Sequence, residues 1–278
     1  MQERSFHSRV RHIMPDLPTA ERKLGELLRN FPGELASYSA SELAQLAEVS
    51  NATVSRFVRR LGYASYEEAR RHARDESASG SRLFLATGGK GVADDPKAYC
   101  EADIGNVRAT VDGMVGGAKV ETLAEALLGA RKVWVIGFRA GAPLAQYLQW
   151  QLLQVVERSV ALPGQGQTLG EHVAGIEAED VVIIFGLRRR IARFDELVAL
   201  VGKTGARVAL ITDQSMALRV DVAWHFRCMT ESPGPLFSHT GVMALLNVIA
   251  NRAIQMAGEA GRKRLIEIEA ANDFLQEL

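Results

Sequence analysis

The second part of the chain alternates short apolar runs with longer helical patterns, and no other feature of the sequence restricts the fold as strongly. From about Tyr99 onward these apolar runs end abruptly at glycine or at a cluster of polar residues. Three runs are strong strand candidates and two are weaker: 132–136, 180–185 and 207–211, then 159–162 and 222–226. Helical patterns separate most of the runs, as at 143–156 and 193–204. Buried strands that alternate with helices predict a parallel sheet with helices on both faces.

The first 76 residues lack this alternation and predict an all-α region of short helices with tight connections. Apolar residues recur at helical spacing after the cap-like Thr19, and Pro32-Gly33 should end that helix: Leu24, Leu27, Leu28 and Phe31. Small polar residues and glycines then follow at 77–81 and 88–91, a composition typical of linkers.

We therefore expect three zones: a helical domain over 1–76, a linker over 77–98 and an α/β domain over 99–278. The last two helices of the α/β domain are expected over 238–256 and 259–278. The first of these is strongly apolar, so it belongs either to the core or to a subunit interface, and periodicity does not separate the two.

Composition excludes several classes of protein. With 278 residues, 47% hydrophobic and 24% charged, the chain can bury a core and is not a disordered polymer. Its apolar runs are far shorter than the ~20 residues of a membrane helix, and the first 14 residues lack the apolar segment of a secretory signal. Two cysteines form neither a disulfide framework nor a metal-spaced pair. We expect a cytoplasmic protein with no membrane partner.

The segment 41–62 has the pattern of a helix-turn-helix. A first short helix, capped by Ser41, should turn its apolar residues inward: Leu43, Leu46 and Ala47, with Ala44 at the close helix crossing. A second helix begins after Ser50, a good N-cap, and ends at Gly62, a good stop. Its inward stripe is expected to be Val54, Phe57, Val58 and Leu61.

The outward face of the second helix favours DNA. Short hydrogen-bonding residues come first and arginines follow, which suits a helix whose first turns face base edges: Asn51, Thr53, Ser55, Arg56, Arg59 and Arg60. The formal net charge is zero, but basic residues crowd between 51 and 74. Glu48 stands where many such turns have glycine, so we expect a local difference there. The alternative interpretation is an ordinary helical hairpin with a solvated basic face.

The segment from Leu17 to Arg74 resembles the N-terminal domain of RpiR-type bacterial transcriptional regulators. The resemblance rests on LPTAERKLGELLRNFP and on SASELAQLAEVSNATVSRFVRRLGYASYEEAR. In that family a Ser-x-x-Thr-Val-x-Arg-Phe pattern lies in the recognition helix, and the matching residues here are Ser50, Thr53, Val54, Arg56 and Phe57. The resemblance implies a C-terminal sugar isomerase (SIS) domain that binds phosphosugars.

Both phosphate-binding turns usual in SIS domains are altered in this sequence. The turn after the first strand has Gly137, Arg139 and Gly141, and arginine and glycine replace the expected glycine and serine. The later turn reads Gly186-Leu187-Arg188-Arg189-Arg190 and lacks the family's serines and threonine. Ligands of open α/β sheets bind beyond the carboxyl ends of the strands. The arginines at these ends could bind a carboxylate or a phosphate through paired hydrogen bonds.

We therefore expect a small anionic metabolite, such as a sugar phosphate or a sugar acid, at these loops and at Ser238 and His239. Two alternatives stay open. The arginines could form salt bridges with acids such as Asp195 and Glu196, or the pocket could be degenerate and serve only for dimerisation.

An enzymatic role is the competing class. Aldose–ketose isomerisation needs a general base, and Glu171, His172 or His239 could supply one. A Glu-His pair at a helix start is more often a cap or a surface group, and the phosphate motifs are absent. We expect a DNA-binding homo-oligomer (dimer or tetramer) without catalysis, cofactor or metal, on a pseudo-palindromic site. The alternative is a phosphosugar isomerase, or a metabolite-binding module whose N-terminal domain contacts protein.

Overall fold

The computed structural model describes residues 6–29, 38–79, 95–114, 118–234 and 236–276. They form two compact units, one from residues up to Asp94 and the other from most residues after it. None of the described helices is long and apolar enough to cross a membrane.

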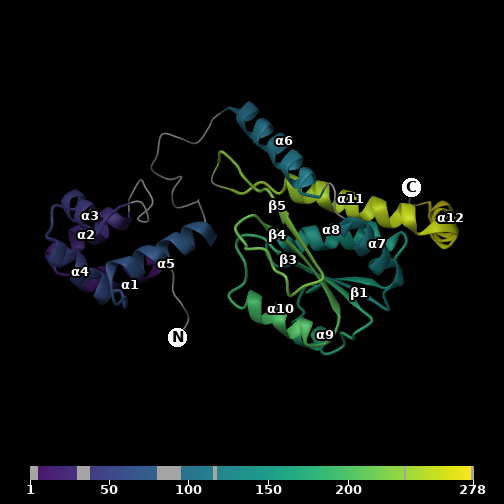
Figure 1. Ribbon diagram of the computed structural model, residues 1–278, viewed down its shortest axis with the longest axis horizontal. Helices are drawn as coiled ribbons and strands as arrows, with labels where there is room; N and C mark the ends of the chain where they lie inside the picture. Colours follow the sequence, from purple (N-terminus) through teal and green to yellow (C-terminus); the bar gives the residue numbers. More distant parts are fainter. Residues whose placement is uncertain (1–5, 30–37, 80–94, 115–117, 235, 277–278) are drawn as a thin grey trace. The chain divides into compact units, whose positions relative to one another are not determined.

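The N-terminal unit is all-α (Figure 1). Its elements are α1 (Phe6–Ile13), the short 3₁₀ helix η1 (Met14–Asp16), α2 (Thr19–Arg29), α3 (Ala40–Leu46), α4 (Asn51–Arg60) and α5 (Tyr66–Ser79). Every helix contributes to one apolar core, whose largest fully buried side chains are Phe6, Phe57, Leu24 and Leu43. The expected residues Phe31 and Pro32-Gly33 at the end of α2 lie outside the described residues.

Both ends of the expected linker 77–98 are helical. Helix α5 continues to Ser79, and helix α6 (Pro96–Asp112) already begins at Pro96, with the Asp95 side chain accepting the Lys97 N–H at 2.9 Å. The expected linker therefore has helix at both of its ends. At the second end an Asp N-cap followed by proline starts the helix. Residues 80–94 lie outside the described residues.

The C-terminal unit is built on a five-stranded parallel sheet in the order β2-β1-β3-β4-β5. The strands are β1 (Val133–Ile136), β2 (Ser159–Leu162), β3 (Val181–Gly186), β4 (Arg207–Asp213) and β5 (Trp224–Cys228). The parallel α/β fold and all five strands are confirmed, although β5 begins and ends two residues later than the expected 222–226. Strand β4 runs two residues beyond its apolar run and ends at Asp213.

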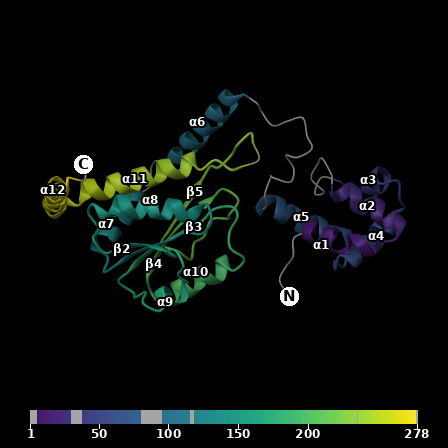
Figure 2. The same ribbon diagram turned by 180° about the vertical axis from the view of Figure 1, so that it is seen from behind.

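Helices cover both faces of the sheet, as Figures 1 and 2 show from opposite sides. The helices are α7 (Lys119–Gly129), α8 (Gly141–Leu153), α9 (Gly170–Val173), α10 (Phe194–Gly202), α11 (Thr240–Met256) and α12 (Gly258–Leu275). One core cluster joins α7, α8 and α11 to one face of the sheet, and a second joins α9 and α10 to the other. Helix α11 buries Leu245, Leu246 and Ile249, so it is a core element.

The strand order places a switch point between β1 and β3. The chain leaves β1 through α8 on one face and leaves β3 through α10 on the other, so the loops after these neighbouring strands diverge at the carboxyl edge. Ligands of open α/β sheets bind at such a switch point.

Candidate nucleic-acid interface and strand-end rim

Helix α3 begins with a complete capping box. The Ser39 hydroxyl accepts the Glu42 N–H at 3.2 Å, and the Ser39 N–H donates to the Glu42 carboxylate at 2.7 Å. The expected cap, Ser41, is instead an exposed residue in the first turn of the helix. Ser39 and Ser41 are both good N-cap residues, so the choice between them is not evident from either one alone. Glu42 favours Ser39, because a capping box needs a glutamate three residues after the N-cap.

The turn between α3 and α4 has the backbone conformation that glycine usually supplies. Glu48 has φ 52°, and its N–H and that of Val49 bond to the Gln45 and Ala44 carbonyls at 3.1 and 2.9 Å. The expected local difference is therefore not seen. A side chain in this region costs about 1 kcal/mol, which the packing of the two helices outweighs.

The inward faces of the two helices largely follow the expected pattern. Val54, Phe57, Val58 and Leu61 are at most 4% exposed, and α3 buries Leu43, Ala44 and Ala47. Leu46 is 49% exposed, so its expected inward position is wrong. Ser50 caps α4 by accepting the Thr53 N–H at 3.2 Å, and Gly62 follows the helix with φ 91°.

Two of the expected outward residues of α4 hold the fold together. Thr53 is 4% exposed, and its hydroxyl bonds to the Ser50 hydroxyl at 3.0 Å, so its expected outward position is wrong. Arg60 is on the surface, but its Nε donates to Glu21 of α2 at 2.9 Å, and Glu21 is 4% exposed. This ion pair fixes α4 against α2.

The remaining exposed residues of α4 form one stripe of polar and basic groups, and we call it the α4 stripe: Asn51, Ala52, Ser55, Arg56 and Arg59. The Arg56 guanidinium lies along its own helix and donates to the Ala52 carbonyl at 3.3 Å. Within the described residues the Arg59 side chain has no hydrogen-bond or ion-pair partner. Ala52 was not expected as a candidate, because its small side chain gave no signal in the sequence.

The glycines after β1 and β3 are needed for close packing. A Cβ on Gly137 would lie 2.1 Å from the Gly141 carbonyl oxygen, and one on Gly186 would lie 2.5 Å from the Phe194 ring. A Cβ on Gly141 would lie 2.9 Å from the Phe185 Cβ. All three glycines are buried, so these expected ligand residues shape the loops and present no side chain of their own.

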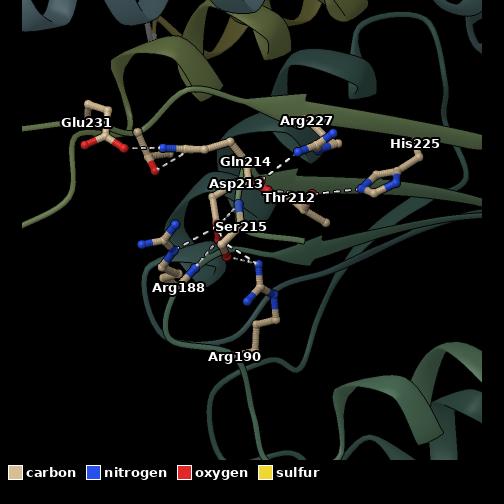
Figure 3. Close-up of polar contacts among 10 residues, drawn as sticks. Arg188, Arg190, Thr212, Asp213, Gln214, Ser215, His225, Arg227 and Glu231 are labelled. Atoms are coloured by element: carbon tan, nitrogen blue, oxygen red, sulfur yellow. Dashed lines mark hydrogen bonds and ion pairs between the residues drawn. The ribbon is translucent and has the colours of Figure 1, made fainter. Parts of the chain in front are cut away.

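A buried carboxylate organises the loop after β3 (Figure 3). Asp213, at the end of β4, accepts the Arg188 N–H at 2.8 Å, Arg188 Nε at 3.0 Å and Arg190 Nη2 at 2.9 Å. The N–H of Ser215 donates to it at 2.9 Å, and the Ser215 hydroxyl bonds to it as well. Burial opposes the charge, but Ser215 and the two guanidinium groups outweigh it and lower the pKa of Asp213.

A second layer of hydrogen bonds supports Asp213. His225 Nδ1 accepts the Arg219 N–H at 2.9 Å, so its Nε2 carries the hydrogen and donates to the Thr212 hydroxyl at 2.8 Å. That hydroxyl donates to the Asp213 carbonyl at 3.1 Å. Burial and the nearby cation of Arg227 lower the pKa of His225 to about 4, so its imidazole is neutral. Neither Asp213 nor His225 was expected in the site.

The residues just before α11 lie beside Arg188 and Asp213. The Arg188 guanidinium lies 5.0 Å from the Phe237 ring centre. Burial lowers the pKa of His239, and the negative charge of Asp213 opposes that shift, so the two groups are close enough to interact. The Ser238 hydroxyl bonds to Asp103 and, at 2.8 Å, to the Thr240 hydroxyl.

The four arginines of the two loops therefore divide into two pairs. Arg188 and Arg190 are ion-paired and mostly buried, with the Nε of Arg190 buried and unpaired. Arg139 and Arg189 are exposed, and their side chains have no hydrogen-bond or ion-pair partner among the described residues. Arg188 and Arg190 therefore follow the alternative in which the arginines form salt bridges. Their acid is Asp213 and not the expected Asp195, which pairs with Arg219 at 2.6 Å.

Two of the three candidate general bases, Glu171 and His172, are bonded within their own loop. His172 Nε2 lies 3.0 Å from the Gln167 side-chain oxygen, and the Thr168 hydroxyl donates to Glu171. That hydrogen bond lowers the pKa of Glu171, whereas proton transfer at neutral pH is best served by a raised one. In the part of the chain that the structure describes, no group of three His, Cys, Asp or Glu could hold a metal.

Comparison with known families accounts for both units. Residues 6–80 match the helix-turn-helix domain of the rpiR family, and residues 126–251 match the SIS domain. The chain thus joins a helix-turn-helix domain of the rpiR family to a SIS domain. It is 26% identical over 210 residues to the HTH-type transcriptional regulator HexR of Pseudomonas aeruginosa, a match that covers 73% of this chain and 71% of HexR.

Two solved structures share the fold. The sugar isomerase domain of an RpiR transcription factor from Sphaerobacter thermophilus is 22% identical, with a TM-score of 0.56, and the match covers 63% of this chain and 98% of that one. The NanR protein of Vibrio vulnificus, solved in complex with ManNAc-6P, is 16% identical with a TM-score of 0.58. That match covers 98% of this chain and 99% of NanR.

Proposed function

We propose that the protein is a cytoplasmic transcription regulator that binds double-stranded DNA through the α4 stripe and is controlled by a small anionic metabolite. The observation that carries the proposal is the exposed stripe on a capped, firmly packed second helix of an RpiR-type helix-turn-helix. Residues 1–76 would contact DNA, 77–98 would connect, and 99–278 would bind the metabolite and pair two or more copies. A pair of such units reads a pseudo-palindromic site.

DNA binding is tested by selecting bound fragments from genomic DNA with the full-length protein, followed by salt-titrated binding to the best fragment. We expect one site to bind at least about a thousandfold more tightly than random DNA, which is the low end for specific regulators. Weak binding that is the same for all sequences would reject the regulator and favour a role of the N-terminal unit in protein contacts.

Two substitutions on the α4 stripe separate phosphate contacts from base contacts. Arg59→Ala should weaken binding to specific and random DNA alike and reduce the salt slope by about one. Asn51→Ala should relax sequence choice, at a cost of about 1–3 kcal/mol on the specific site alone. Arg108→Ala, an exposed arginine of α6, is the matched control and should change neither. Equal losses on specific and random DNA for both stripe variants would contradict these roles.

The metabolite is proposed to bind at the switch point between β1 and β3, held by the guanidinium groups of Arg139 and Arg189. These are the unpaired arginines of two loops that follow neighbouring strands. Arg188 and Arg190 would position the loop through Asp213, with His239 and Ser238 at its border. The sugar phosphate bound by the related NanR supports an anion as the ligand class. Control of DNA binding requires that the ligand bind one arrangement of the paired copies better than another.

A thermal-shift screen of sugar phosphates and sugar acids tests this site. At a hundredfold excess over Kd a ligand adds about 2.7 kcal/mol, which should raise Tm by at least ~5 °C for a domain of this size. Arg139→Ala and Arg189→Ala should each reduce the shift severely. Arg158→Ala, an exposed arginine just before β2 at the opposite edge of the sheet, should preserve it. An equal shift in all four proteins would reject the two arginines as ligand contacts.

A further inference from the structure

The buried side chains that attach helix α6 to the α/β unit are polar. All residues of α6 are described, and the buried ones are Asn106 and Thr110. The Asn106 amide donates to the Glu231 carbonyl at 2.7 Å and accepts the Glu231 N–H at 3.1 Å. The Thr110 hydroxyl accepts the Met229 N–H at 3.0 Å. Hydrogen bonds weaken steeply when donor and acceptor shift or tilt, so this attachment depends on the position of the segment that follows β5.

Gln214 connects that segment to the carboxylate that organises the loop after β3. It directly follows Asp213, and its side-chain N–H donates to the Glu231 carboxylate at 2.6 Å. Its side-chain oxygen accepts the Thr230 hydroxyl at 3.1 Å, and Thr230 is buried. Figure 3 shows the Gln214 side chain reaching from Asp213 toward Glu231. One route of contacts therefore leads from the arginines on Asp213, through Gln214, to α6.

A second route starts from Arg188 and reaches α6 one turn earlier. The Arg188 guanidinium lies 5.0 Å from the Phe237 ring centre, and Ser238 is the next residue after Phe237. The Ser238 hydroxyl donates to the Asp103 carboxylate of α6. Asp103 comes three residues before Asn106, so both routes end on the same face of the helix. Arg188, which also bonds to Asp213, therefore contacts the start of both routes.

We propose that the position of the loop after β3 controls how firmly α6 is attached, through these two routes. Arg189 is the proposed metabolite contact and the next residue after Arg188, so an anion that moves Arg189 also moves Arg188. Networks of directional bonds that are either made or broken carry such a change between distant groups. Because α6 is the first helix of its unit, the chain from the N-terminal unit enters there. The inference rests on the proposed function only for the ligand and for the unit that is controlled.

Exchanging the donor and the acceptor of one hydrogen bond tests the first route. Gln214→Glu keeps the shape of the side chain but places a second carboxylate against that of Glu231. Glu231→Gln alone keeps an acceptor for the Gln214 N–H. The double variant again has one donor and one acceptor, in exchanged places. Hydrogen–deuterium exchange of the α6 amides is measured by mass spectrometry on the full-length protein, with α10 on the opposite face of the sheet as the internal reference.

Gln214→Glu should speed exchange in α6 at least about tenfold, because a hydrogen bond to a charged group is replaced by repulsion. Glu231→Gln alone and the double variant should each stay within about twofold of the wild type. Exchange in α10 should not change in any of the three. If α10 also exchanges faster in Gln214→Glu, the whole unit is less stable, and Gln214→Met, which removes the bond without adding a charge, takes its place.

A substitution at the other end of the routes tests whether the loop after β3 is the source. Arg188→Lys keeps the positive charge but loses the Nε bond to Asp213 and the planar contact with Phe237, so α6 should again exchange about tenfold faster. Combined with Gln214→Glu, its effect should be smaller than the product of the two, since both act on one network. Arg158→Lys, at an exposed arginine, is the matched control and should leave α6 unchanged.

The outcomes separate this inference from the proposed function. Three results overturn it: α6 exchange that Gln214→Glu does not change, an increase that Glu231→Gln does not reverse, or effects of Arg188→Lys and Gln214→Glu that multiply. These measurements need neither DNA nor metabolite, so such results leave the proposed function in place. Failure to find a specific DNA site rejects the proposed regulator, and the exchange results still decide whether α6 follows the loop. Recovery in the double variant, with effects smaller than the product, supports the inference.

Discussion

Replacing Asp213 by asparagine should destabilise the α/β unit by about 3–5 kcal/mol, the usual cost of removing one partner from a buried ion pair. Asparagine has nearly the same shape, but it leaves the cations of Arg188 and Arg190 uncompensated. Its amide NH₂ would also face some of the N–H and O–H donors that now converge on the carboxylate. Denaturant unfolding followed by tryptophan fluorescence measures the loss, since all three tryptophans belong to this unit.

The matched control is Asp221→Asn. Asp221 also pairs with an arginine, Arg219, but its side chain is 56% exposed, so its loss should cost less than about 1 kcal/mol. If both substitutions cost the same, the buried carboxylate does not organise the loop. The proposal that Arg188 and Arg190 only position the neighbouring ligand contacts would then be wrong.

Acidification should destabilise the same unit in a window between pH 6.5 and pH 4. Burial lowers the pKa of His225 from 6.5 to about 4, so within this window the unfolded chain binds a proton that the folded protein excludes. The free energy of unfolding is therefore highest above pH 6.5 and falls with pH, by on the order of 3 kcal/mol in total. The pKa of His239 is also lowered and adds to the loss in the same direction.

Denaturant titrations at closely spaced pH values measure this slope. His225→Gln should be less stable than the wild type at pH 7.5 but should lose less stability between pH 6.5 and pH 4. Asp213 and Asp180, whose pKa values are lowered below 3.8, lose their contribution only at still lower pH. A His225→Gln slope identical to that of the wild type would show that the acid sensitivity comes from other groups.

The sequence predicted the central strands well because β1 and β3 are continuous apolar runs with abrupt ends. Parallel strands buried on both faces leave that signature without reference to distant residues. The inward stripe of α4 was equally readable, since helical spacing alone assigns Val54, Phe57 and Val58 to one side. The cap at Ser50 and the stop at Gly62 are likewise local signals.

Two residues of the candidate sites, Arg60 and Arg188, are held in the fold by a partner distant in sequence. Arg60 belongs to the fold because Glu21 lies 39 residues earlier, and Arg188 because Asp213 lies 25 residues later. No local pattern indicates such pairs. Asp213 itself was overlooked because it follows the apolar run of β4 and resembles an ordinary strand end. The error at Thr53 has a local origin, because Thr53 is at the margin of the helical face, where helical spacing alone does not show that it is buried and bonded to Ser50.

The packing of α4 divides its residues into two sets with almost no overlap. The first set holds the helix in place: the four apolar residues of the inward stripe together with Ser50, Thr53 and Arg60. The second set is the α4 stripe, whose side chains make few contacts with the rest of the unit. Side chains on the stripe can therefore be exchanged for those of another regulator while the anchors stay in place. A library randomised at these five positions would retain a folded N-terminal unit in most members. Transplanting α4 whole into an unrelated scaffold would instead separate Arg60 from Glu21 and misplace the helix.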